Sequence, residues 1–340
     1  MTTIATCGGG TAGHVLPCIA LLPHLKKHFD RVIHLGVNGM EKHLMPKHGI
    51  PFFETNSIKF DRSNLIKNLK IPFVLSAASK QAKQILAHEN VDVLFSKGGY
   101  ASLPAVLGAK SLQIPIIIHE SDYQMGLANK MASFFADLVL TSFPETKNGI
   151  YVGNPIREEI FQGNPWYPLQ KYELNSHKQT ILVFGGSSGA RVINDVIFKI
   201  AHKLTSKYNV IHLIGDKEKR RLFTHDYVAI PYADNIADLY ALADLVIMRG
   251  GANSLQEATM LGKRVICIPL PKSKYSRGDQ VANAISYQRR GLINILPQDH
   301  LTEDSLINEI ATVISQKEHP ICKDTPNEKI VEQILTMLKN

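Results

Sequence analysis

The sequence predicts an α/β protein with two doubly wound, Rossmann-like domains, and three observations lead to this fold class. Short apolar runs alternate with helix-like segments along nearly the whole chain, a pattern typical of parallel sheets covered by helices on both faces. A glycine turn follows the first apolar run, at residues 8–13, and another follows the run at 180–184. A stretch rich in proline, glycine and polar residues, 154–178, separates the two halves.

The apolar runs set the expected elements and domains. Runs predicted as strands are 3–6, 31–35, 93–96, 116–119, 138–141, 180–184, 210–213, 227–230, 245–248 and 264–269, and helices between them include 80–88 and 192–204. We expect an N-terminal domain over 1–153, a C-terminal domain over 154–328, and a final helix over 329–340 that packs back on the first domain. Because ligands of such folds bind where parallel strands end, the predicted site is a cleft between the domains.

Composition excludes several classes of protein. The 340 residues, 44% of them hydrophobic, are enough for two domains with separate cores. No apolar run approaches the ~18 residues that span a bilayer, and the chain does not start like a signal peptide. The four cysteines are scattered, which favours reduced thiols over disulfides or zinc ligands. The net charge of +8 favours anionic partners, but no basic run with interleaved aromatic residues indicates nucleic acid.

The first glycine turn is a formal match to G-x-G-x-x-G between a strand and a helix. A dinucleotide site also needs an acidic residue at the end of the second strand, and the first acid there is Glu41. A P-loop needs Gly-Lys-Ser/Thr, whereas Gly13 is followed by His14 and Val15. The turn is therefore predicted to hold another kind of phosphate, or only to let the helix pack closely on its strand.

His14 falls in the first turn of the predicted helix. The helix dipole there lowers the basicity of an imidazole and keeps it available as a neutral base. The alternative is a capping or surface histidine, one of 14 in the chain.

Other stretches place polar groups after predicted strands. SKGGYASLPA (96–105) repeats the strand, glycine and helix pattern, and HESD (119–122) ends a strand but lacks the second histidine of the zinc motif HExxH. Arg157, in GNPIRE, is a candidate cation for a diphosphate or a surface arginine. Gln280 begins a helix and suits sugar hydroxyls, although capping by Asp279 also explains that stretch.

Residues 248–271 carry the strongest signal of the second half. A strand ends at Met248, two glycines follow, and a helix is predicted from about Ser254 to Leu261. Glu257 has two interpretations: it accepts hydrogen bonds from ribose hydroxyls, or it forms a capping box with Ser254.

Taken in order, these motifs make the sequence similar to the MurG family over residues 8–284. They are GGGTAGHVLP, SKGGYASLPA, HES with GLANK, GNPIRE, GGSSGA, RGGANSLQE and SRGDQVANA, the last resembling the low-GC Gram-positive branch. The resemblance implies a GT-B fold and inverting transfer of N-acetylglucosamine from UDP-N-acetylglucosamine to lipid I, making lipid II for peptidoglycan. It implies no cofactor and no metal ion, and the chain contains no D-x-D motif.

The resemblance also implies a donor set of residues in the second domain and an acceptor set in the first. The donor set is Arg157 and Ser187 at the diphosphate, Ala252, Asn253, Ser254 and Glu257 at the nucleotide, and Gln280 at the sugar. The acceptor set is Thr11, Ala12 and Gly13 facing a diphosphate, His14 as candidate base, and Tyr100 and Glu120 nearby.

Three positions depart from the family's pattern. Ala12 replaces the middle glycine of TGGH, so a close backbone approach there is in doubt. Asp122 stands where many members have Asn, and a carboxylate is unfavourable beside an anionic donor. Asp279 and Gln280 replace a pair of glutamines, of which we assign Gln280.

The resemblance implies a peripheral protein on the cytoplasmic face of the cell membrane, acting with UDP-N-acetylglucosamine, lipid I and other cell-wall synthesis proteins. Residues 59–75 mix basic and apolar side chains, as expected for docking on an anionic leaflet or for a core helix. Two alternatives stay open: another enzyme of this fold, such as a UDP-N-acetylglucosamine 2-epimerase or a different lipid-linked sugar transferase, and a non-catalytic nucleotide-sugar-binding subunit. The missing acid after the second strand disfavours a nicotinamide oxidoreductase.

Overall fold

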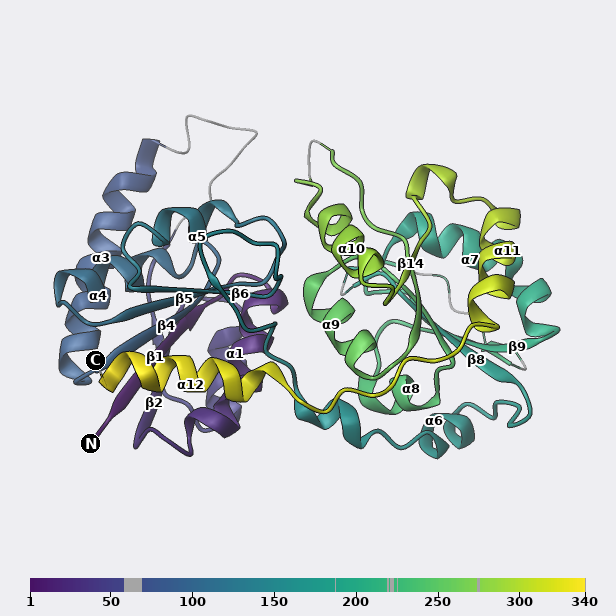
Figure 1. The fold of residues 1–340 in the computed structure, drawn as a ribbon, viewed down its shortest axis with the longest axis horizontal. Helices are drawn as coiled ribbons and strands as arrows, with labels where there is room; N and C mark the ends of the chain where they lie inside the picture. The colour runs from purple at the N-terminus through teal and green to yellow at the C-terminus, as the bar shows by residue number, and fades with distance from the viewer. Residues whose placement is uncertain are drawn as a thin grey trace. The chain divides into compact units, whose positions relative to one another are not determined.

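The computed structural model describes residues 1–57, 69–186, 188–218, 220, 223–224, 226–273 and 276–339. The chain forms two compact units (Figure 1). Unit 1 comprises Met1–Arg157 and Thr325–Asn340, and unit 2 comprises Glu158–Asp324. The sequence analysis places the first boundary at residue 153, whereas the contacts divide the chain after Arg157.

Unit 1 contains a parallel sheet of seven strands in the order β3-β2-β1-β4-β5-β6-β7. The strands are β1 (Thr3–Gly8), β2 (Arg31–Gly36), β3 (Phe52–Glu54), β4 (Val93–Gly98), β5 (Ile116–Glu120), β6 (Leu138–Thr141) and β7 (Ile150–Tyr151). The strand order reverses between β1 and β4, so the crevice typical of nucleotide-binding folds lies at their carboxyl ends.

Helices cover both faces of this sheet. They are α1 (Ala12–Leu25), α2 (Glu41–Lys47), α3 (Ile71–His88), α4 (Leu103–Ser111), α5 (Leu127–Ala132) and α12 (Pro326–Lys339). Apolar side chains of α1 and α12 share one core, and those of α3 and α4 share the other. Although α12 comes last in the chain, it packs beside α1 (Figure 1), burying Ile330, Val331 and Ile334.

Unit 2 repeats the doubly wound topology with the order β10-β11-β9-β8-β12-β13-β14. The strands are β8 (Gln179–Phe184), β9 (Tyr208–Leu213), β10 (Phe223–Thr224), β11 (Tyr227–Ile230), β12 (Leu245–Met248), β13 (Arg264–Cys267) and β14 (Asn294–Ile295). Pairing is parallel except between β10 and β11. Here the order reverses between β8 and β12.

The helices of unit 2 also lie on both sides of its sheet. They are α6 (Trp166–Lys171), α7 (Arg191–Thr205), α8 (Ile236–Leu242), α9 (Ala252–Met260), α10 (Asp279–Arg289) and α11 (Glu303–Ile314), with 3₁₀ turns η2 (Glu158–Gln162) and η3 (Gln298–His300). Helices α7 and α11 bury their apolar side chains in one core, and Figure 1 shows α8, α9 and α10 on the other side of the sheet. The predicted α/β class with two Rossmann-like domains is confirmed.

Within unit 1, the segment that leaves the unit and the segment that returns to it are joined. The side chain of Asn327 accepts a hydrogen bond from the Ile156 amide (3.0 Å) and donates one to the Ile156 carbonyl (2.8 Å). A Cβ atom at Gly153 would lie 2.6 Å from Pro326 Cγ, so the two segments also touch. In the described part of the chain, no helix is both long and apolar enough to cross a bilayer.

Candidate functional site

In unit 1, two glycine turns interlock at the carboxyl ends of β1 and β4. Gly10 and Gly99 both have left-handed backbone conformations, with φ of +79° and +83°. A Cβ atom at Gly10 would lie 2.5 Å from the Tyr100 ring, and one at Gly99 would lie 2.9 Å from the Gly9 carbonyl oxygen. The absence of side chains therefore lets the turns approach each other.

His14 lies in the first turn of α1 with its ring against the second glycine turn. Its Nδ1 atom is 3.2 Å from the Lys97 carbonyl oxygen, which can only accept a hydrogen bond. In the neutral ring, Nδ1 therefore carries the proton and the lone pair is on Nε2. A Cβ atom at Gly99 would come within 3.2 Å of Nε2, so glycine is needed beside the ring. The role of His14 as base stays a prediction.

The start of α1 carries the predicted residues Thr11, Ala12 and Gly13. Thr11 is the N-cap residue but makes no capping hydrogen bond with its side chain. Thr11 and Gly13 are exposed and Ala12 is half-buried, so the helix end that attracts anions is accessible.

Glu41 is a site residue that the sequence analysis does not predict. It is fully buried at the start of α2, and its Oε1 atom accepts hydrogen bonds from the Gly10 and Val37 amides, each at 3.2 Å. Its buried Oε2 atom has no hydrogen-bond partner among the residues that the structure describes. The pKa of the Tyr100 hydroxyl is raised, mainly by burial and further by the negative charge of Glu41. Glu41 thus connects the first glycine turn with the predicted residue Tyr100.

Glu120 ends β5 and is almost completely buried. Its carboxylate accepts hydrogen bonds from the Asp122 amide, the Gly126 amide and the Asn129 side chain, each at 2.9 Å. These contacts show a residue that orders the loop between β5 and α5. The predicted place of Glu120 beside the acceptor stays a prediction.

Lys97 and His119 form a buried pair between the ends of β4 and β5. Lys97 Nζ donates to His119 Nδ1 (2.8 Å) and to Ser121 Oγ, while His119 Nε2 donates to the Gly153 carbonyl oxygen (2.8 Å). Burial, and then the charge of Lys97, hold the pKa of His119 well below its usual value, so the ring is neutral. Burial also lowers the pKa of Lys97 to about 8.

In unit 2, the corresponding glycine turns follow β8 and β12. At Gly186 and Gly251, an added Cβ would have no atom of the described residues within 4 Å. Gly250 is different, because a Cβ atom there would lie 2.5 Å from the Gln280 carbonyl oxygen. Ser187, expected at the diphosphate, lies outside the described residues.

Helix α9 corrects one prediction. It begins at Ala252 with Gly251 as N-cap, not at Ser254, so Ser254 and Glu257 form no capping box. Because residues three or four apart share a helix face, Asn253, Ser254 and Glu257 lie together, and all three are half-buried, whereas Ala252 is buried.

Helix α10 lies against the glycine turn that follows β12. Asp279 is its first residue, and Gly278 is the N-cap, so capping by Asp279 is also wrong. Gln280 Oε1 accepts a hydrogen bond from the Leu270 amide (3.0 Å), and Asn283 donates to the Gly250 carbonyl (3.2 Å). Arg157 is half-buried at the last residue of the first segment of unit 1.

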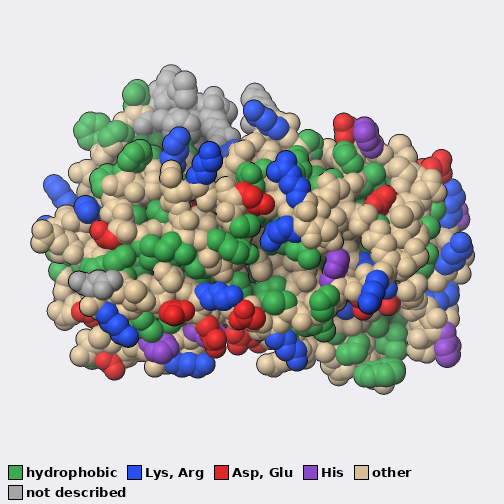
Figure 2. Space-filling model, viewed as in Figure 1, with side chains coloured by type: hydrophobic (Ala, Val, Ile, Leu, Met, Phe, Trp, Pro, Cys, Tyr) green, Lys and Arg blue, Asp and Glu red, His purple; other side chains and the backbone are tan. Residues whose placement is uncertain are grey.

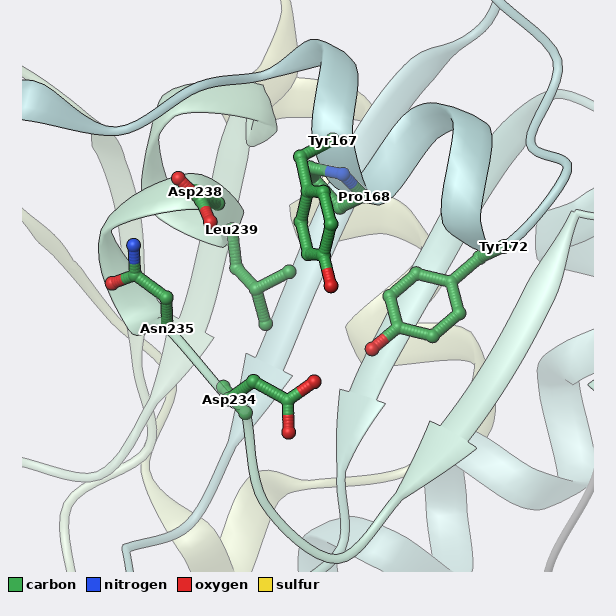
Figure 3. Close-up of a pocket in the computed structure, with 8 residues that line it drawn as sticks. Tyr167, Pro168, Tyr172, Asp234, Asn235, Asp238 and Leu239 are labelled. Atoms are coloured by element: carbon green, nitrogen blue, oxygen red, sulfur yellow. The ribbon is translucent and has the colours of Figure 1, made fainter.

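A small pocket lies apart from these residues, between α6 and the start of α8 (Figure 3). Tyr167, Tyr172 and Asp234 turn toward it. Lys171 forms an ion pair with Asp234 and lies 5.4 and 5.5 Å from the centres of the two tyrosine rings, so the chain's own cation balances the acid. Among the residues the structure describes, no three His, Cys, Asp or Glu side chains gather as a metal site.

Comparisons with known proteins match both halves of the chain to one family of glycosyltransferases. Residues 4–141 match the glycosyltransferase family 28 N-terminal domain, and residues 180–338 match the C-terminal domain of that family. A protein of Clostridium perfringens named UDP-N-acetylglucosamine--N-acetylmuramyl-(pentapeptide) pyrophosphoryl-undecaprenol N-acetylglucosamine transferase is 38% identical over 93% of this chain and 91% of its own length. A Lachnospira eligens protein of the same name is 37% identical over 100% of this chain and 99% of its own.

Solved structures share the fold. The crystal structure of Acinetobacter baumannii MurG has a TM-score of 0.75 at 22% identity, covering 99% of this chain and 100% of that one. A putative UDP-N-acetylglucosamine 2-epimerase from Listeria monocytogenes has a TM-score of 0.71 at 12% identity, covering 99% of this chain and 96% of that one. Because the Clostridium and Lachnospira relatives exceed 30% identity over nearly the full length, the chain belongs to the MurG family of glycosyltransferases, within glycosyltransferase family 28.

Proposed function

We propose that the chain transfers N-acetylglucosamine from UDP-N-acetylglucosamine to the 4-hydroxyl of N-acetylmuramic acid in lipid I, with inversion at the anomeric carbon. The names of its relatives give the substrates. The structural observation that carries the proposal is the placement of His14 in the first turn of α1, with Nδ1 3.2 Å from the Lys97 carbonyl oxygen and the ring packed against Gly99 of the interlocked glycine turns.

His14 supplies the base of this reaction. As the acceptor hydroxyl attacks the anomeric carbon, its proton passes to His14 Nε2 and the bond to the UDP oxygen breaks. A positioned general base accelerates such a step by roughly 100- to 10,000-fold. Thr11, Ala12 and Gly13 bind the acceptor diphosphate at the positive end of α1. Tyr100 borders the same turn, with its ring on Gly10.

The donor binds at the carboxyl ends of β8 and β12. Glu257 accepts hydrogen bonds from the ribose, with Asn253 and Ser254 on the same face of α9. The amide oxygen of Gln280 accepts from Leu270, and the NH₂ group of Gln280 donates to a sugar hydroxyl. Charge on the leaving diphosphate is stabilised by Arg157, Ser187 and the N-terminus of α9.

The chain binds the cytoplasmic face of the membrane peripherally through unit 1. Of the expected docking stretch 59–75, residues 59–68 lie outside those the structure describes. In the rest, Leu69, just before α3, and Phe73, in its first turn, are 71% and 79% exposed, and Lys70 between them is also exposed. Figure 2 shows hydrophobic and basic side chains together over this part of unit 1. Apolar anchors with basic neighbours suit an anionic leaflet.

The membrane assignment is tested by co-sedimentation with phosphatidylglycerol vesicles. Phe73→Ser should weaken binding, and Tyr151→Ser, which removes another exposed aromatic ring of unit 1, should not. Equal binding by both variants would contradict the assignment.

The transfer reaction is tested by UDP release from UDP-N-acetylglucosamine with and without a lipid I analogue, in the presence of EDTA. The wild type should need the lipid and tolerate EDTA. His14→Ala should lose activity while retaining donor affinity, and His43→Ala, an exposed histidine of α2, should behave as the wild type. Turnover without lipid would indicate an epimerase instead, and UDP binding without turnover would indicate a nucleotide-sugar-binding subunit.

A further inference from the structure

We propose that Lys97 is a positioning residue for His14, holding the end of β4 whose carbonyl group binds the imidazole ring. This inference rests on the proposed function, because it takes His14 as the base. The Lys97 main chain and side chain have separate roles: the carbonyl oxygen receives His14 Nδ1–H, and the ammonium group anchors the residue in the interior.

The anchor is unusual because lysine is rarely fully buried. Lys97 is 0% exposed, and its ammonium group has two partners on the neighbouring strand end, His119 Nδ1 and Ser121 Oγ. A buried ammonium is stable only with good hydrogen bonds, so its partners fix its position closely. Because β4 ends one residue later at Gly98, this fixed point lies directly before the glycine turn.

The two partners of the Lys97 ammonium group are themselves hydrogen-bonded to the segment that leaves unit 1. His119 donates to the Gly153 carbonyl (2.8 Å), and Ser121 donates to the Asn154 side chain (3.3 Å). Lys97 therefore connects the carbonyl that orients His14 with the segment 153–154. Through these buried hydrogen bonds, a shift of this segment would change the position of the His14 ring.

Lys97 also accounts for a departure from the family's pattern. Asp122 is unfavourable beside an anionic ligand, but the charges of Glu120 and Asp122 act on Lys97 and oppose the fall of its pKa. The two carboxylates therefore favour the charged form of Lys97, whose ammonium group offsets them. Burial raises the pKa of the nearby Cys18 thiol of α1 to about 12, so Cys18, like the neutral His119 ring, adds no charge at pH 7.

A double-mutant cycle tests the inference. Lys97→Met keeps the length of the side chain but removes its donors, and Lys110→Met changes an exposed lysine of α4 as a control. We expect Lys97→Met to lower kcat by about 10- to 100-fold, with a smaller change in KM, and Lys110→Met to have no effect. In the His14→Ala background, Lys97→Met should cause no further loss, because its effect passes through His14.

An equal loss in both backgrounds, or a Lys97→Met enzyme with wild-type kcat, would overturn the inference. Wild-type kcat in His14→Ala alone would instead refute the base assignment of the proposed function. If Lys97→Met does not fold, Ser121→Ala removes one acceptor and should give a smaller loss, again absent without His14.

A second measurement does not depend on activity. In ¹⁵N NMR of labelled histidine, His14 should be the Nδ1–H tautomer in the wild type and a mixture of tautomers in Lys97→Met or Ser121→Ala. An unchanged tautomer would also overturn the inference.

Discussion

Gly99→Ala should separate the activity of the chain from its stability. The new Cβ atom would lie 2.9 Å from both the Gly9 carbonyl oxygen and His14 Cδ2. Reaching an ordinary contact of about 3.4 Å requires the ring to move by about 0.5 Å. Since a misplacement of about 1 Å costs about 100-fold, half that distance predicts a loss of about tenfold in kcat.

Stability should fall as well, and a control isolates that effect. A non-glycine residue in the left-handed region costs about 1–2 kcal/mol, and the overlap adds about 1 kcal/mol or more. Gly49→Ala, also in unit 1, has the same left-handed backbone (φ +70°) but meets only Lys26 Nζ at 4.0 Å. It should lower Tm by a few degrees and leave kcat unchanged.

The assay is lipid-dependent UDP release, with Tm measured on the same preparations. If Gly99→Ala and Gly49→Ala have the same kcat, contact between Gly99 and His14 does not matter for catalysis. A loss confined to KM of the lipid would likewise refute the reasoning, because the displaced group is the base.

Three further predictions concern stability. Asn327→Ala leaves the Ile156 amide and carbonyl without their buried partner, so the free energy of unfolding should fall by about 2–4 kcal/mol in urea titrations, whereas a fall below about 1 kcal/mol would show that water replaces the amide. Gly163→Ala places a Cβ atom 2.1 Å from the Ala237 carbonyl oxygen and should lower Tm far more than Gly291→Ala, whose Cβ meets nothing; similar Tm values would contradict this packing. Burial lowers the pKa of His34 to about 4 and that of His212 to about 3. As pH falls below about 6.5, these histidines therefore bind protons in the unfolded chain before they do so in the folded chain, and each should cost about 2 kcal/mol of stability between pH 6.5 and 5. His34→Asn should reduce this pH dependence of the free energy of unfolding.

The strands were predictable because buried parallel strands are continuous apolar runs. The expected runs 138–141, 227–230 and 245–248 coincide with β6, β11 and β12, and others differ by one or two residues at an end. Strands β3, β7, β10 and β14 have only two or three residues each, too few to show a pattern, and lie at or near sheet edges. Pattern thus identifies the elements that form the core, and pairing with a neighbour creates the rest.

The site was only partly predictable, for a different reason. His14 and the glycine turns are local motifs, which a sequence displays directly. Lys97 gains its role from His119 and Ser121, 22 and 24 residues away, and a buried lysine looks like any other lysine in sequence. The start of α9 was misplaced because a Ser-x-x-Glu pattern resembles a cap, whereas Gly251 occupies that position.

Glu41 explains why the first glycine turn matches a dinucleotide motif without its acidic partner. In a dinucleotide site the glycines make room for a pyrophosphate and the acid after the second strand binds a ribose. Here the acid turns inward: Cβ atoms at Gly9 and Gly39 would lie 2.1 and 2.6 Å from its carboxylate oxygens. The Gly10 amide donates a hydrogen bond to the same carboxylate, and the Tyr100 ring fills the space beside Gly10. Gly9 and Gly10, the latter being the second glycine of the motif, therefore accommodate groups of the chain itself. Among the described residues, an added Cβ at Gly13 in the first turn of α1 would meet nothing closer than 3.7 Å, and this helix end is where we propose that the acceptor diphosphate binds.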